Sequence, residues 1–171
     1  MTDISTRCGG NNSVTPFVAG ELRGYRTWLR SHPDDVPAGM LPLRSVHLPY
    51  VSWTPTLRAR CLAADYGQAT KPHQVPAKGC RCGIYGWYRP HDRRIVPAPV
   101  FGVVAASGAI IMGTHGFRAQ QATIVAIVSR DRETAAACDR AGIAVYRRRR
   151  SLLRDYPTED LTTLLGHHGR A

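Results

Sequence analysis

The chain has 171 residues, of which 43% are hydrophobic and 20% charged, a composition typical of one globular domain with its own core. Its 16 glycines and 12 prolines favour turns over long helices, and no apolar run reaches the roughly 18 residues of a membrane span. The first residues lack the apolar core of a signal peptide, so we expect a cytoplasmic protein.

The charge of the chain points to an anionic partner. The formal net charge is +11, from 23 Lys and Arg against 12 Asp and Glu, and only Lys71 and Lys78 are lysines. Arginine offers a planar fork of donors that suits phosphate and stacks on rings, so the sequence predicts a nucleic-acid partner, DNA or RNA. An acidic protein partner is the alternative, and a GC-rich genome explains the same Arg-to-Lys ratio without any binding function.

The predicted elements begin after a polar, glycine-rich arm over residues 1–20. Strand-like sequence then follows in four places: residues 21–30, 43–53, 57–64 and 82–88. A short helix also fits the first of these, and one helical turn also fits the third. Residues 65–83 are loop by composition because they are rich in Gly and Pro and show no periodicity.

The clearest pattern lies in the second half of the chain. Three apolar stretches separated by turn residues predict an antiparallel meander: Val100–Ala105, Ala109–Gly113 and Ala122–Val128. Glycines within it suit the sharp curvature of a small barrel.

Two short helices and one strand are predicted after the meander. A helix over residues 131–141 is capped by Asp131 and ended by Gly142, and a strand follows over residues 143–146. A last helix is expected over residues 157–166, before a frayed tail over residues 167–171. We therefore expect a single α+β domain over residues 21–166, with a small, twisted, partly barrel-like antiparallel sheet, a zinc-clipped loop and two short C-terminal helices.

Four potential metal ligands lie close together in the sequence: Cys61, His73, Cys80 and Cys82. Their spacing is C-x11-H-x6-C-x-C, and three thiolates with one imidazole match the ligand set of tetrahedral structural Zn²⁺. Residues i and i+2 of an extended segment share a face, so both cysteines of the Cys-x-Cys pair can point to one ion. With four protein ligands the site is closed, and we expect the zinc to be structural.

Two other interpretations of these residues stay open. Buried thiols can serve as small apolar side chains, and His91 is an alternative fourth ligand. A long irregular connection, however, needs something to order it, which favours the metal. The H-x-E with P-C-x-x-C pattern of deaminases and the H-E-x-x-H pattern of zincins are both absent, so catalytic zinc is not expected.

Arginines and aromatic residues form the candidate nucleic-acid surface. One group surrounds the Cys-x-Cys segment, one residue follows His115, and a dense run follows the predicted strand at 143–146. The side chains predicted to contact nucleic acid are Arg81, Trp87, Tyr88, Arg89, Arg93, Arg94, Arg118, Arg147, Arg148, Arg149, Arg150 and Arg154. Because alternate residues of a strand share a face, Tyr85 and Trp87 also fit a core position.

A metal-dependent nuclease is a further alternative. The segment Gly83–Tyr85 resembles the first strand of GIY-YIG nucleases, which also need a Tyr-x-Gly strand, an arginine and a glutamate. Val100–Gly102 has Phe where Tyr is expected, although Arg118 and Glu133 occur in the required order. Enzymatic function is therefore not expected.

A wider resemblance covers roughly residues 20–125. The ordered segments "GYRTW", "ARC", His73, "CRCGIYG" and "HGFRA" are similar to small uncharacterised proteins of actinobacteria and their phages. The resemblance supports linking the four ligands as one site and implies no activity. A phage-encoded factor that acts on a host complex is the protein-interaction alternative.

Overall fold

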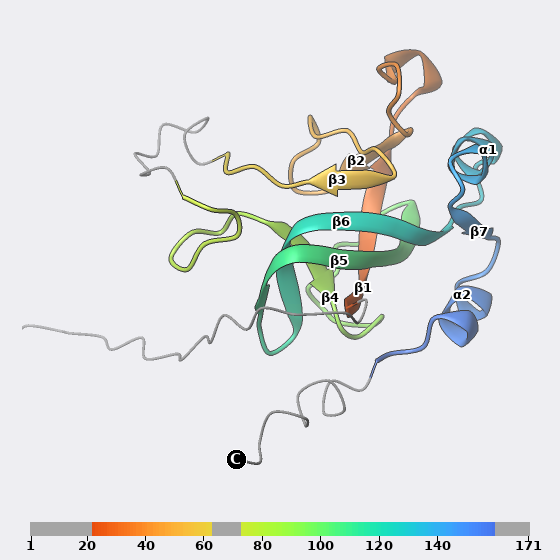
Figure 1. Cartoon of the computed structure of the whole chain (residues 1–171). Helices are drawn as coiled ribbons and strands as arrows, with labels where there is room; N and C mark the ends of the chain where they lie inside the picture. Colours follow the sequence, from red (N-terminus) through yellow and green to blue (C-terminus); the bar gives the residue numbers. More distant parts are fainter. Residues whose placement is uncertain (1–21, 63–72, 160–171) are drawn as a thin grey trace, which may run out of the picture.

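The computed structural model of the chain describes residues 22–62 and 73–159 (Figure 1). The expected N-terminal arm and frayed tail lie outside these residues. The elements, in chain order, are β1 (Leu22–Arg30), η1 (Pro33–Asp35), β2 (Leu43–Ser45), β3 (Thr56–Arg58), β4 (Ile84–Trp87), β5 (Val100–Met112), β6 (Gly116–Val128), α1 (Arg132–Arg140), β7 (Ala144–Tyr146) and α2 (Arg149–Asp155). Within the described part, no helix is long and apolar enough to cross a membrane.

The described strands form one mostly antiparallel sheet, which together with the two short helices confirms the α+β class. Strands β1, β4, β6 and β5 pair in a ring, because β5 bonds both to β6 and back to β1. The link between β1 and β4 is a single residue pair, Tyr25 with Trp87. The sheet curls but is not a clear barrel, so the barrel-like part of the prediction is not supported.

The predicted meander of three strands is a hairpin of two long ones. Strands β5 and β6 have 13 residues each, and β5 runs without interruption through the expected turn at Ser107 and Gly108. The pairing register shifts between Ser107 and Ile110, and Gly108 has a φ of 72°, as at a β-bulge. The hairpin turn lies further on, where the Gly113 N–H donates to the Gly116 carbonyl oxygen over 2.8 Å. Gly108 therefore marks a bend within β5 and not the predicted turn.

The core forms where the curled strands approach each other. The rings of Trp28 and Trp53 pack edge to face with centroids 5.5 Å apart. Phe117 on β6 is 2% exposed and lies against Gly24 of β1 and Gly86 of β4. A Cβ atom on Gly86 would lie 2.3 Å from the Phe117 ring, so only glycine lets β4 pass so close to this ring.

The first predicted helix is confirmed and the second lies elsewhere. The Asp131 carboxylate accepts from the Thr134 N–H over 2.9 Å and caps α1. Helix α2 instead begins in the arginine run, without a side-chain cap, and is held by the fully buried Leu152. Residues 157–159, where the second helix is predicted to begin, are not helical, and the rest of that prediction lies outside the described residues. Tertiary packing outweighs local capping signals here.

Candidate metal centre and basic surface

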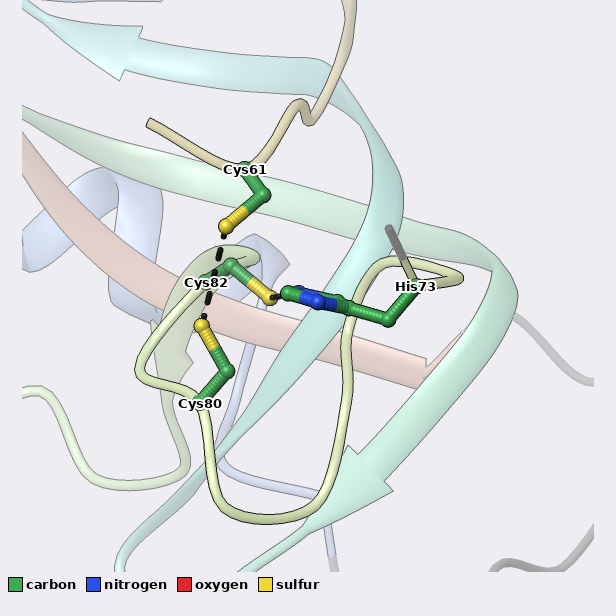
Figure 2. Close-up of side chains that lie close together, drawn as sticks. All are labelled: Cys61, His73, Cys80 and Cys82. Carbon is green, nitrogen blue, oxygen red and sulfur yellow. Dashed lines mark hydrogen bonds between the residues drawn. The ribbon is translucent and has the colours of Figure 1, made fainter. Parts of the chain in front are cut away.

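The four predicted ligands converge on one point, although they come from separate segments. Cys61 follows β3, whereas His73, Cys80 and Cys82 belong to the irregular segment that leads into β4. Their donor atoms all lie within 4.8 Å of one another, and all four residues are half-buried. Figure 2 shows the four side chains pointing toward one another. They lie close enough to hold a metal ion.

Two distances within the cluster match those between ligands of a tetrahedral site. Cys61 Sγ lies 3.7 Å from Cys80 Sγ, and Cys82 Sγ lies 3.4 Å from His73 Nε2. Bonds of about 2.3 Å to sulfur and about 2.0 Å to nitrogen place tetrahedral ligand atoms about 3.8 Å (S to S) and about 3.5 Å (S to N) apart. A disulfide requires about 2.05 Å between sulfurs, so the thiols are not bonded to each other.

Within residues 22–62 and 73–159, neither Cys138 nor the alternative histidine His91 joins this cluster. His91 is exposed beyond the far end of β4, and Cys138 is fully buried in α1. Cys8 lies outside the described residues. The fourth donor of the cluster is therefore His73, as the spacing favours.

Local backbone geometry brings the two cysteines of the Cys-x-Cys pair together. The Cys80 N–H donates to the Ala77 carbonyl oxygen over 3.3 Å, which closes a turn. Gly79 and Gly83 on either side have φ values of 81° and 117°, a region that L side chains rarely adopt. A Cβ atom on Gly83 would also lie 3.1 Å from the side chain of Arg118. The two flanking glycines are thus required for the loop shape.

The surroundings of Cys80 favour the deprotonated form of its thiol. The pKa of Cys80 is lowered to about 7, chiefly by the backbone N–H of Cys82 and further by the side chains of its cluster neighbours. The pKa of Cys82 is raised because burial and the adjacent thiols disfavour its charged form. A metal ion bound by both thiols would hold both in their deprotonated form.

Arg118 supports this loop, a contact that was not predicted, and its role as a phosphate contact stays a prediction. Its Nη1 donates to the carbonyl oxygen of Cys80 and, over 3.2 Å, to that of Cys82. The residue reaches the loop because β6 pairs with β4, which places Arg118 opposite Tyr85. Sequence reasoning missed this role because the pairing register is not visible in the sequence.

Of the two aromatic residues predicted to contact nucleic acid, Tyr88 is buried. Tyr88 is 7% exposed, and its ring centroid lies 6.1 Å from that of Phe117. Burial raises the pKa of Tyr88 to about 12. Trp87 is half-buried beside Tyr85, with ring centroids 6.2 Å apart, and stays a prediction.

Three predicted arginines already have partners within the fold. The Arg149 guanidinium stacks 3.8 Å from the centre of the Phe101 ring and donates to the Pro90 carbonyl oxygen, so its role is structural. Arg94 pairs with Asp92 over 3.3 Å, and Arg154 pairs with Asp155 over 2.9 Å. The last two pairs are partly exposed, and their arginines keep further donors.

The other predicted arginines are exposed. They are Arg81, Arg89, Arg93, Arg147, Arg148 and Arg150. Among residues 22–62 and 73–159, no carboxylate forms a salt bridge with any of these six side chains. Arg81 lies at the metal centre, between two of its ligands.

The contact of Arg149 joins two basic segments that are far apart in the sequence. Because Arg149 bonds to Pro90, the start of α2 lies against the loop that follows β4. The five arginines that lie near these two residues in the sequence are all exposed, and we call Arg89, Arg93, Arg147, Arg148 and Arg150 the basic surface. The metal loop and the helices lie on opposite sides of the sheet in Figure 1.

A groove with charged lining residues, which the sequence analysis did not predict, lies at the end of β4; we call it the polar groove. It has a volume of about 880 Å³ and lies between residues 88–94 and the β5–β6 turn at Thr114 and His115. Its walls meet only through strand pairing, so no local motif marks it. Asp92 and His115 are the groove residues that sequence reasoning did not connect.

Among the described residues, the metal centre contains no carboxylate that would support the nuclease alternative. Glu133 is exposed in the first turn of α1, and the ligand cluster of the described residues consists of thiols and one imidazole. Comparison with known proteins finds no matching family model, no similar curated protein and no similar solved structure. A proposal for the function therefore depends on the geometry of the metal centre and on the basic surface.

Proposed function

We propose that the chain is a non-enzymatic nucleic-acid-binding module, in which a structural Zn²⁺ orders the loop before β4 and exposed arginines contact phosphates. Three thiolates and one imidazole form a ligand set that favours Zn²⁺ over hard cations such as Mg²⁺ or Ca²⁺. All four positions of a tetrahedron are taken by protein ligands, which leaves no open position for substrate. The proposed zinc is therefore structural.

The observation that carries the nucleic-acid proposal is the contact between Arg149 and Pro90, which joins the basic surface. Five exposed arginines without carboxylate partners among the described residues repel one another unless an anion lies between them. A polyanion satisfies all of them at once, and each neutralised phosphate releases counterions.

The zinc part is tested by elemental analysis of the purified protein. We expect one equivalent of zinc, lost in Cys61→Ser, Cys80→Ser, Cys82→Ser and His73→Ala. The matched controls Cys8→Ser and Cys138→Ser should keep it, because Cys138 lies outside the cluster. A wild-type protein that binds no zinc after refolding with the metal would refute this part.

The nucleic-acid part is tested by fluorescence anisotropy with single-stranded and duplex DNA and RNA over a range of salt concentrations. We expect log K to fall linearly with log salt, and each of Arg147→Gln, Arg148→Gln and Arg150→Gln to reduce the slope by about one. Arg132→Gln, an exposed arginine of α1 outside the basic surface, is the control.

Two results would replace this proposal with another. No binding of any nucleic acid at low salt would favour an acidic protein as the partner of the same surface. Cleavage of the probe with Mg²⁺ or Mn²⁺ that is lost in Glu133→Gln would favour the nuclease.

A further inference from the structure

The polar groove at the end of β4 has the size and lining of a small-ligand site. Its volume of about 880 Å³ falls within the range of about 300–1,000 Å³ that is usual for such sites. Although most of the exposed lining area is apolar, the side chains include three arginines, two histidines and two threonines beside two carboxylates: Tyr88, Arg89, His91, Asp92, Arg93, Arg94, Thr114, His115, Thr158 and Glu159.

The walls of the groove are fixed by backbone hydrogen bonds. The Tyr88 N–H donates to the His115 carbonyl oxygen over 3.0 Å, which ties the loop after β4 to the β5–β6 turn. The loop itself is folded by two turns, in which Asp92 N–H donates to Arg89 and Asp92 accepts from the Ile95 N–H. The floor is the buried ring of Tyr88. The groove is therefore formed before any ligand arrives.

Asp92 organises the basic side chains of the groove. Its Oδ1 accepts from the Arg94 N–H over 2.9 Å and from Arg94 Nη1 over 3.3 Å, and its Oδ2 lies 3.4 Å from His115 Nδ1. The Asp92 side chain is only 7% exposed, whereas that of His115 is 48% exposed. The carboxylate is thus occupied by its neighbours, while Nε2 of His115 and the other Arg94 donors remain for a ligand.

The charge of the groove selects an anion. Asp92 offsets Arg94, and Glu159 accepts from the backbone N–H of Arg23 over 3.3 Å. Arg89 and Arg93 are exposed and have no carboxylate partner within residues 22–62 and 73–159. Three arginines against Asp92 and Glu159 leave the groove with a formal net charge of +1, because the backbone N–H of Arg23 does not neutralise the Glu159 carboxylate. The two guanidiniums without a carboxylate partner suit the three terminal oxygens of a phosphate monoester, whereas an internal phosphodiester offers only two.

We infer that this groove binds a phosphate monoester, with Arg89 and Arg93 holding the phosphate and Asp92 positioning Arg94 and His115 toward it. Free nucleotides and the phosphorylated ends of nucleic-acid strands carry this same group. The inference goes beyond the proposed function, because a groove that bound only free nucleotides would satisfy it.

The test compares the binding of adenosine 5′-monophosphate and adenosine to the full chain by calorimetry, with ³¹P line broadening as a second readout. We expect the monophosphate to bind at least about tenfold more tightly than adenosine, and Arg93→Gln to remove about tenfold of its affinity. Arg132→Gln is the control and should change neither. Equal binding of the two ligands, or equal effects of the two variants, would overturn the inference.

Asp92→Asn separates positioning from simple electrostatics. Removing a negative charge beside an anion site would tighten binding if Asp92 acted only through its charge. Because Asp92 orients two donor side chains, we expect weaker monophosphate binding instead, and tighter binding would refute its positioning role.

The source of the phosphate is identified with oligonucleotides that carry either a 5′-phosphate or a 5′-hydroxyl. A preference for the phosphorylated strand that disappears in Arg93→Gln supports the inference and identifies strand ends. Tight monophosphate binding without that preference supports it and identifies free nucleotides. Binding of the 5′-hydroxyl strand reports on the basic surface, which shares Arg89 and Arg93 with the groove. Arg147→Gln separates the two proposals, because it should weaken both strands equally and leave monophosphate binding unchanged.

Discussion

The guanidinium of Arg118 and the carbonyl oxygen of Cys82 lie 3.2 Å apart, which connects the centre of the sheet to the metal loop. The same Nη1 also donates to the carbonyl of Cys80. The peptide groups that follow Cys80 and Cys82 are thus held by a side chain from a strand remote in sequence.

The first prediction concerns metal affinity. Arg118→Gln should weaken zinc binding about 10- to 100-fold, because it removes a side chain that holds the ligand-bearing loop in position. Loss of such a supporting group typically lowers metal affinity by this factor. Competition with a chromophoric chelator measures the change. Arg81→Gln removes an exposed arginine that lies between the same two cysteines, and it should leave the affinity unchanged. Equal losses in both variants would show that net charge, and not the Arg118 contact, controls the affinity.

The second prediction concerns the packing of β4 on Phe117. Gly86→Ala should destabilise the protein by about 1–3 kcal/mol, because its Cβ would lie 2.3 Å from the Phe117 ring. Gly113→Ala, whose Cβ would meet only a carbonyl oxygen at 3.3 Å, is the milder control. Urea unfolding measures both changes. Combining Gly86→Ala with Phe117→Leu should recover part of the loss relative to the sum of the single variants, and simple additivity would contradict the proposed clash.

The third prediction separates a structural arginine from a binding arginine in the same helix. Arg149→Gln should lower the thermal midpoint, because it loses the contact with Phe101 and the hydrogen bond to Pro90. Arg150→Gln should leave the midpoint unchanged and weaken only nucleic-acid binding. Calorimetric melting and anisotropy on both variants test this separation, and identical behaviour of the two would refute it.

The fourth prediction concerns the cap of α1 and its pH dependence. Asp131→Ala should cost about 1 kcal/mol, whereas Asp131→Asn keeps a capping oxygen and should cost less. The pKa of Asp131 is lowered from its usual 3.8, chiefly by the Thr134 N–H and also by Arg30. A lowered pKa means that the carboxylate stabilises the fold above about pH 3.8 and that this contribution disappears as the pH falls through the lowered value.

Urea unfolding between neutral and acidic pH measures that dependence. The difference in free energy of unfolding between wild type and Asp131→Asn should be constant near neutral pH and shrink below pH 3.8. A difference that stays constant down to the acid limit would show that the charge of Asp131 does not contribute.

The ligand set was accessible to sequence reasoning because metal chemistry restricts the residue types and because the loop offered little core to bury thiols. The choice of His73 over His91 followed from spacing, and the convergence of the donor atoms bears it out. The contacts of Arg118 and Tyr88 within the fold were not predicted, for one shared reason. Whether an arginine or a tyrosine faces solvent or a carbonyl depends on strand register, which the sequence does not encode locally.

The predicted strand and helix boundaries were wrong where tertiary contacts determine them. Gly108 is a typical turn residue, yet the hydrogen bonds on both sides carry β5 past it, so it forms a bulge. The arginine run has neither a cap nor a regular apolar stripe, and it becomes α2 because Leu152 enters the core beside Phe101 and Tyr25. These contacts join residues far apart in the chain, and no local window contains them.

Strand β4 has only four residues, with the Cys-x-Cys pair just before it and the polar groove just after it. Each of these sites also needs a residue from outside this segment, Cys61 for one and His115 for the other. A peptide cut out around β4, or a graft of it onto another scaffold, would therefore carry most of both sites and assemble neither. For protein engineering, the smallest transferable unit is the whole curled sheet.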